Sequence, residues 1–294
     1  MNGTIRDELW PYFEPLWRDL RSIDDKFLLI GGYALFLKHR WLISRPEVRT
    51  VIPLARWRDA APRVTKDFDL IANIELIASI EDQSAVQAVL DRQGFAVVPD
   101  HARWQFEKSI GEGRDVVLEF NVVPPLAPRT DVRHDDRRVK PKPSLGDTGI
   151  HGHANPEATG CDIRPFSFVI DGVEVFIPNA ASIAMMKMTA MRDRWQRAQK
   201  MNAGTARDFE QAQAEKHARD VYKAVAMVTR EENDTMREVL DAIRALPVFS
   251  GAADIREEFF SDPNGTGVRM ITDNWEQNDA LGIGRMLADW FSKK

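Results

Sequence analysis

The sequence predicts an α+β protein that combines a mixed β-sheet and its helices with a mainly helical C-terminal lobe. Three observations support this prediction: a glycine pair joins an apolar run to a helical pattern, two segments read as strands, and a hairpin signal precedes a long helical pattern. We expect a core over residues 1–125, an irregular insertion or linker over 126–165, and the hairpin with the helical lobe over 166–294.

Both ends of the chain carry helical patterns. Near the N-terminus, apolar side chains recur at helical spacing: Leu9, Tyr12, Phe13, Leu16, Trp17 and Leu20. Residues 280–291 show a similar pattern. Such stripes indicate helices that pack against a core or a partner.

A glycine pair, Gly31-Gly32, interrupts the apolar run of residues 27–37. Glycines at a strand-to-helix turn let the backbone approach a phosphate, and the following helix presents free N–H groups. This arrangement would seat a phosphate. The alternative is an ordinary tight turn in a buried β-α unit.

Two carboxylates, Asp67 and Asp69, stand two residues apart in a segment that reads as a strand. Side chains alternate along a strand, so these two share one face, roughly 7 Å apart along the backbone. Phe68 and Leu70 point to the opposite, apolar side. Carboxylate oxygens suit Mg²⁺, whose shell is often completed by substrate phosphates. The alternative is a solvated strand without a ligand.

A third carboxylate is expected on the strand over residues 115–123, which ends at Pro124-Pro125. Leu118, Phe120 and Val122 would face the core and leave Glu119 on the other side. We select Glu119, while Asp115 at the strand entrance could take its place. A solvent-facing Glu on a half-buried strand is the alternative without function.

A hairpin is predicted for residues 166–177, because Asp171-Gly172 separates two strand-like runs. Asn179 then offers an N-cap for a helix over residues 180–201. Lys187 and Arg194 lie seven residues apart in this helix, about two turns, so both can project from one face.

Together, Gly31-Gly32, the Asp67 and Asp69 pair and the later acidic strand resemble the nucleotidyltransferase superfamily. Within it the chain looks like the AbiEii type, found in abortive-infection and toxin–antitoxin systems, from about residue 27 to residue 228. The resemblance makes residues 1–125 the catalytic core. The family more often has Asp as the third carboxylate.

The resemblance also selects residues in the C-terminal half. It implies that Lys187 contacts nucleotide phosphates and that Arg194 belongs to the same nucleotide-binding set. Where the family commonly has a Lys-Asp pair, this chain has Lys216-His217 and, three residues on, Arg219-Asp220. We select Asp220 as the functional acid, which could orient Lys187 or assist deprotonation of the acceptor. A salt bridge between Lys216 and Asp220 is the structural alternative.

The function implied is transfer of a nucleotidyl group from an NTP to an acceptor hydroxyl. Asp67, Asp69 and Glu119 would hold Mg²⁺, and Gly31 and Gly32 would seat the triphosphate. The acceptor would be a tRNA end or a protein, and the chain could be a toxin with a cognate antitoxin. The alternatives are a small-molecule nucleotidyltransferase, acting for example on aminoglycosides, and a catalytically inert nucleotide-binding module.

Composition fits a cytoplasmic enzyme without a membrane partner. The 294 residues include one Cys, which excludes an internal disulfide framework, and the net charge is -5. Basic residues nevertheless gather in two clusters, one from Lys38 to Arg63 and one from Arg129 to Lys142. The first could hold RNA phosphates or be solvated loop charge. We interpret the second as solvated loop charge.

Overall fold

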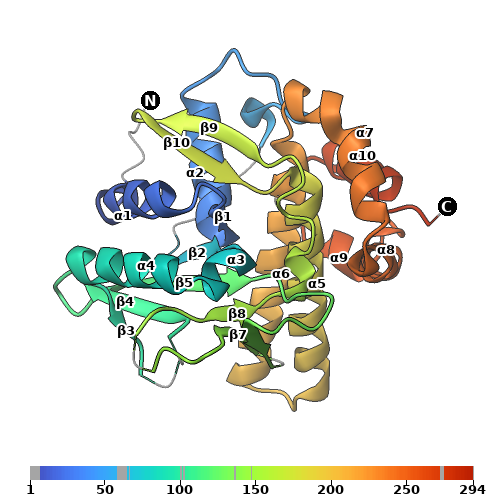
Figure 1. The fold of residues 1–294 in the computed structure, drawn as a ribbon. Coiled ribbons are helices and arrows are strands. Elements are labelled where there is room, and N and C mark those ends of the chain that lie inside the picture. The colour runs from blue at the N-terminus through green and yellow to red at the C-terminus, as the bar shows by residue number, and fades with distance from the viewer. Residues whose placement is uncertain are drawn as a thin grey trace. The chain divides into compact units, whose positions relative to one another are not determined.

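The computed structural model describes residues 7–57, 65, 67–99, 101, 103–135, 137–146, 148–271 and 275–293. It confirms the predicted α+β class (Figure 1). The chain divides into two compact units. The first contains residues 1–40, 63–156 and 167–177, and the second contains residues 41–62, 157–166 and 178–294.

Within the described residues, eight strands form one mixed sheet in the first unit. In chain order they are β1 (Leu28–Ile30), β2 (Asp67–Ile71), β3 (Ala96–Val97), β4 (Gln105–Ser109), β5 (Asp115–Val122), β6 (Val132–His134), β7 (Arg138–Pro141) and β8 (Gly152–Ala154). Their spatial order is β1-β2-β5-β8-β7-β6, and β4 joins β5 to β3. β5 is parallel to both β2 and β8, whereas β1 and β2 are antiparallel.

The two central strands follow the predicted alternation. Phe68 and Leu70 of β2 are buried, while Asp67 is exposed and Asp69 is half-buried. On β5 the residues predicted to face the core, Leu118, Phe120 and Val122, are each 0% exposed. Period-two patterning therefore places one face of these strands in the core.

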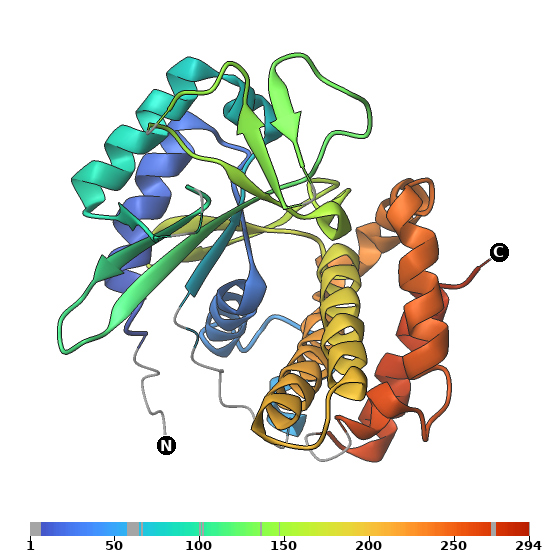
Figure 2. The same ribbon diagram turned by 90° about the horizontal axis from the view of Figure 1, so that it is seen from below.

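The helices of the first unit begin at recognisable signals. They are α1 (Trp10–Ile23), α2 (Gly31–Ile43, which continues into the second unit), α3 (Ile74–Ala78) and α4 (Ile80–Gln93). Ser79 caps α4 by accepting a hydrogen bond from the backbone of Asp82. α1 and α4 lie side by side (Figures 1 and 2), and Arg92 of α4 bonds Asp19 of α1 at 3.0 Å.

A hairpin of β9 (Phe166–Ile170) and β10 (Val173–Ile177) has the predicted bounds. Asp171 and Gly172 both have positive φ, 48° and 76°, as a tight two-residue hairpin turn requires. The expectation that this hairpin groups with the C-terminal lobe was wrong, because residues 167–177 belong to the first unit. One cause is a tie to α1: the indole N–H of Trp17 donates to the Glu174 carbonyl at 2.8 Å.

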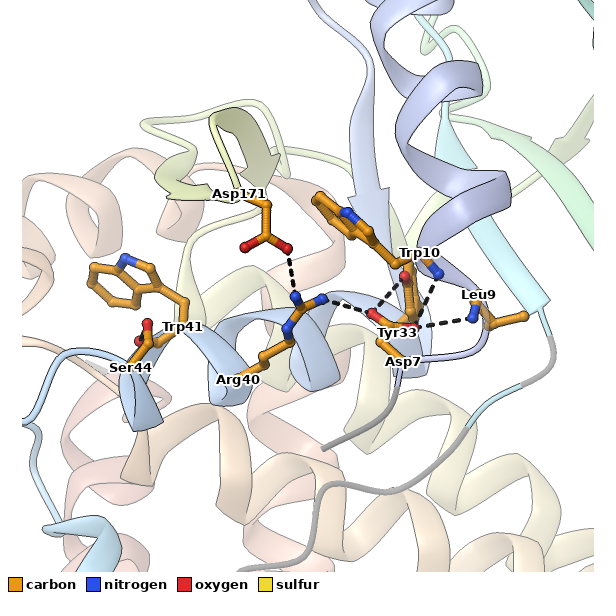
Figure 3. A network of polar contacts seen from close by, with 8 residues as sticks. All are labelled: Asp7, Leu9, Trp10, Tyr33, Arg40, Trp41, Ser44 and Asp171. Atoms are coloured by element: carbon orange, nitrogen blue, oxygen red, sulfur yellow. Dashed lines mark hydrogen bonds and ion pairs between the residues drawn. The ribbon is translucent and has the colours of Figure 1, made fainter. Parts of the chain in front are cut away.

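The turn of this hairpin belongs to a polar network around Asp7 (Figure 3). One carboxylate oxygen of Asp7 accepts hydrogen bonds from the Tyr33 hydroxyl at 3.0 Å and from Arg40 at 3.1 Å. The second terminal nitrogen of Arg40, Nη2, donates to Asp171 at 2.5 Å. Burial raises the pKa of Asp7 against the opposing effects of these donors. The network ties the N-terminal segment, α2 and the hairpin together.

The prediction of an irregular segment over residues 126–165 was wrong in part. This segment supplies β6, β7 and β8 to the main sheet, followed by a short 3-10 helix, η2 (Pro156–Ala158). These strands have only three or four residues each and include Pro141, so local propensity hardly marks them. Pairing of β8 with β5 adds them to the sheet.

The second unit is mainly helical, as predicted. Its elements are η1 (Leu54–Arg56), α5 (Ala180–Lys200), α6 (Thr205–Ala226), α7 (Arg230–Arg244), α8 (Pro247–Phe260), α9 (Thr266–Arg269) and α10 (Gln277–Trp290). Asn179 caps α5 as expected, accepting from the backbone of Ser182 at 2.8 Å. None of the helices in the described part of the chain has the length and apolar character needed to cross a bilayer.

Candidate functional site

The predicted carboxylates share one face of two neighbouring strands. Asp69 of β2 stands directly beside Glu119 of β5 in the parallel register, and Asp67 lies two residues earlier on the same face. Asp67 is exposed, whereas Asp69 and Glu119 are half-buried. Asp115, the other candidate for the third carboxylate, lies on the same face at the start of β5, four residues before Glu119.

Gly31 lies against one of these carboxylates, Asp69. It ends the turn from β1 into α2 with φ +74°, and a Cβ atom added there would lie 2.0 Å from Oδ2 of Asp69. The contact follows from the sheet, because Ile30 is the antiparallel partner of Asp69. Gly31 is therefore required both by its backbone conformation and by the close approach of Asp69. Gly32 lies in the first turn of α2 without positive φ.

Two residues beside the carboxylates, His153 and Thr65, were not predicted as site residues from the sequence. Nδ1 of His153 on β8 lies 3.0 Å from Oε1 of Glu119, where the ring N–H can donate to the carboxylate. The imidazole also stacks on Trp104, with ring centroids 4.6 Å apart. Thr65 donates a hydrogen bond to Oδ1 of Asp67. Only the parallel pairing of Asn121 with His153 brings β8 to this place, so no local pattern could have identified the histidine.

The donor set can be tested against the predicted Mg²⁺. In the part of the chain that the structure describes, no three His, Cys, Asp or Glu side chains form a group that could hold a metal ion. The predicted three-carboxylate group is thus not preformed. Mg²⁺ usually takes only one or two protein carboxylates, with waters and substrate phosphates as the other ligands. Asp67 and Asp69 fit that requirement, while Glu119 is engaged by His153.

A pocket of about 340 Å³ opens at the end of the sheet where β2 and β5 begin. Its lining includes Thr65, the hydrogen-bond donor to Asp67, and Asp115. Tyr33 and Phe36 of α2 also line it. Its volume lies at the lower end of the range, about 300 to 1,000 Å³, of small-molecule sites.

The predicted residues of the second unit lie on the facing sides of α5 and α6. Nζ of Lys187 is 3.1 Å from Oδ2 of Asp220, and both side chains are buried. Arg194 forms two hydrogen bonds, of 3.0 and 3.1 Å, with the carboxylate of Glu210. Each of these two cations of α5 therefore has a carboxylate partner on α6, so the packing of the two helices accounts for both ion pairs.

His217 lies within this charged cluster. Burial, with a further contribution from the Lys187 charge, lowers the pKa of His217 to about 3, although Asp220 acts in the opposite direction. Its Nδ1 atom is buried without a hydrogen-bond partner among the described residues. The imidazole is thus neutral in the folded protein at neutral pH.

Several cations of the first basic cluster, Lys38 to Arg63, are buried or have partners within the fold. Arg56 pairs with the buried Asp279 at 2.5 Å, Arg40 belongs to the Asp7 network, and Lys38 is 1% exposed. Arg58 and Arg63 lie outside the described residues.

Comparisons of this chain with protein-family models, with curated proteins and with solved structures give no match.

Proposed function

We propose that this protein is a Mg²⁺-dependent nucleotidyltransferase that moves a nucleotidyl group from an NTP to an acceptor hydroxyl and releases pyrophosphate. One observation carries the proposal: Gly31, at the start of a helix, lies directly against Asp69, and Asp67 and Glu119 share the same face. A glycine turn at a helix N-terminus can seat phosphates, and adjacent carboxylates can hold the cation that phosphates attract.

The residues have separate tasks in this proposal. Asp67 and Asp69 would hold Mg²⁺, which when bound would neutralise phosphate charge and act as a Lewis acid. Gly31 and Gly32 would bind the triphosphate through the first N–H groups of α2. Glu119 orients the His153 ring through the 3.0 Å hydrogen bond. The acceptor oxygen would form a bond to the α-phosphorus while the bond from that phosphorus to the pyrophosphate oxygen breaks, and the hydroxyl proton would pass to solvent water.

The resemblance supplies the wider context. It supports Lys187, held by Asp220, as a cation that neutralises triphosphate charge, with Arg194 in the same set. It also supports a tRNA end or a protein as the acceptor, and a toxin whose partner is a cognate antitoxin. These assignments belong to the proposal.

A small cationic acceptor is the second candidate. Among the described residues that line the pocket beside Asp67, three are acidic, Asp7, Glu8 and Asp115, and one is a cation, Arg114. Excess carboxylate favours an amino-bearing molecule such as an aminoglycoside. The acceptor that becomes labelled separates the two readings, and a protein that binds NTP without releasing pyrophosphate would be an inert binding module.

The test is incubation with each labelled NTP, Mg²⁺ and either total RNA or an aminoglycoside, followed by detection of label and pyrophosphate. Asp69→Asn is the informative variant, because it keeps the size of the side chain and removes the charge. Glu81→Gln, on the exposed side of α4, is the matched control. Equal transfer by Asp69→Asn and the control would exclude the proposed site.

A further inference from the structure

We propose that Arg133, Lys140 and Lys142 of the β6–β7 hairpin bind the phosphodiester backbone of a nucleic-acid strand. That this strand is the acceptor rests on the function proposed above. The binding itself requires neither NTP nor metal. The hairpin lies in the segment that we interpreted as solvated loop charge on sequence alone.

The three cations lie on one face of the hairpin. Arg133 of β6 and Lys140 of β7 are directly opposite each other in the antiparallel register. Lys142 follows two residues after Lys140 and extends the pairing, since its backbone N–H donates to the Asp131 carbonyl at 2.8 Å. Alternation along β7 therefore puts Lys142 on the same side as Lys140. Arg133 and Lys142 are exposed, and Lys140 is half-buried.

Within the described part of the hairpin, these charges have no counter-ions. Among the described residues, none of the three forms an ion pair or a side-chain hydrogen bond. Three described carboxylates nearby have other partners: Asp135 pairs with Arg138, and Arg129 binds both Asp131 and Glu75. Like charges directly opposite each other destabilise a strand pair, so this arrangement weakens the hairpin unless an anion binds it.

The cationic face continues into the carboxylate face of the same sheet. In the strand register, Asp69 lies beside Glu119 of the adjacent strand, and Asn121, two residues after Glu119, lies beside His153. His153 in turn lies opposite Arg138, two residues before Lys140. Directly opposed residues share a face, so these registers connect Asp69 with Lys140. With strands about 4.8 Å apart, β7 lies roughly 10 Å from β5 and β6 roughly 14 Å.

A hollow beside the hairpin strengthens the assignment. It has a volume of about 650 Å³, and Arg129, Arg133, His134 and Lys142 contribute to its lining. No acidic residue is among its described lining residues. Leu126, which is 77% exposed, also contributes to its lining. A groove of one charge sign raises the local concentration of an oppositely charged ligand.

Protection of an edge strand is the competing explanation, since β6 is the outermost strand on its side of the sheet. Charged residues on edge strands hinder association between sheets. That role requires no nucleic acid, so it predicts aggregation of uncharged variants and unchanged binding. The two explanations can be separated by measurement.

The experiment measures fluorescence anisotropy of labelled RNA and DNA strands of one sequence, about 12 nucleotides long, across a salt titration without NTP or metal. The triple variant Arg133→Gln, Lys140→Gln, Lys142→Gln should bind at least about tenfold more weakly, and its salt slope should be smaller by about 2. A larger loss on RNA than on DNA identifies RNA as the ligand. An equal loss identifies the shared backbone, and both results support the site.

The matched control removes three other exposed cations, by Lys26→Gln, Arg197→Gln and Lys200→Gln. The control should bind like the unaltered protein. Unchanged affinity of the triple variant, equal losses in both triple variants, or an equal loss of polyglutamate binding would overturn the assignment. If the triple variant aggregates, Arg133→Gln alone should still lower the salt slope by about 0.7, while Arg133→Lys should keep it. Equal slopes in those two single variants would also overturn the proposal.

Discussion

Two charged regions differ in whether their charges have partners of opposite charge. One is the carboxylate face of β2 and β5, and the other is the charged cluster between α5 and α6. Asp67 is exposed and has no cationic partner among the described residues, and Glu119 bonds an imidazole. Between α5 and α6, by contrast, Lys187 and Arg194 are each matched with a carboxylate.

The difference shows which charges the fold itself explains. The fold itself accounts for the paired charges between the packed helices. Each charge needs its partner, because removing either one would leave a buried charge without a counter-ion. Carboxylates placed side by side on a sheet face repel each other, and this repulsion opposes folding. A ligand accounts better for the carboxylate face, and a nucleotide role for Lys187 has to be shown in a variant that keeps the fold intact.

The largest expected effect is on activity. Asp67→Ala or Asp69→Ala should lower nucleotidyl transfer by about 10⁴-fold, about 5 kcal/mol in activation free energy, because cation binding is lost. For Asp67→Ala, urea denaturation should show unchanged or slightly raised stability, since like-charge repulsion is relieved. Full activity of Asp69→Ala, or a large loss of stability in Asp67→Ala, would show that these carboxylates serve the fold and not the reaction.

The next effect is on stability. Asp220→Leu should lower the free energy of unfolding by about 3 to 5 kcal/mol, because the buried Lys187 loses its counter-ion. The half-buried pair Glu215 and Arg219, at 3.4 Å, is the control, and Glu215→Ala should cost under about 1 kcal/mol. Urea denaturation measures both.

The double variant Lys187→Met, Asp220→Leu sharpens this result. It should recover most of the lost stability, since apolar side chains replace the whole pair. In this stable background NTP affinity should fall about tenfold, about 1.4 kcal/mol, while Lys200→Ala should leave it unchanged. NTP binding equal to that of the unaltered protein would reduce Lys187 to a structural role.

A smaller effect is expected at the glycine turn. Gly31→Ala should lower stability by about 2 to 3 kcal/mol, because an L-residue is strained at positive φ and its Cβ meets Asp69. In the double variant Gly31→Ala, Asp69→Ala, the loss of stability due to the clash should disappear. The loss due to backbone strain should remain. Additive losses in the double variant would show that the two residues do not press on each other. Gly172→Ala is the control for strain alone, since its φ is +76° with open space around it.

The smallest effect concerns pH. The pKa of His217 is about 3 in the folded protein against 6.5 in the unfolded chain, so the unfolded state binds the additional proton between these values. Stability should therefore fall as pH falls below about 6.5. From about pH 7.5 to about pH 5.5, His217→Phe should lose about 1.4 kcal/mol less than the unaltered protein.

Thermal or urea denaturation at both pH values measures this difference. His134→Gln, at an exposed position, should follow the unaltered protein. The same pH dependence in His217→Phe would show that other groups cause it.

Sequence alone determined the elements that depend on near neighbours in the chain. Asp171-Gly172 set the hairpin and Asn179 the start of α5, because turn and cap geometry involve only a few consecutive residues. Alternation likewise put Asp67 and Asp69 on one face, opposite the buried Phe68.

Only the tertiary structure decided which distant segments meet. The register of β2, β5 and β8 brings Gly31 to Asp69 and His153 to Glu119, and the packing of α5 on α6 supplies Asp220 and Glu210 as partners. The short strands of residues 132–154 exist through pairing at the sheet edge, where their own propensity is weak. Such contacts depend on long-range pairing, which leaves no periodic signal in the sequence.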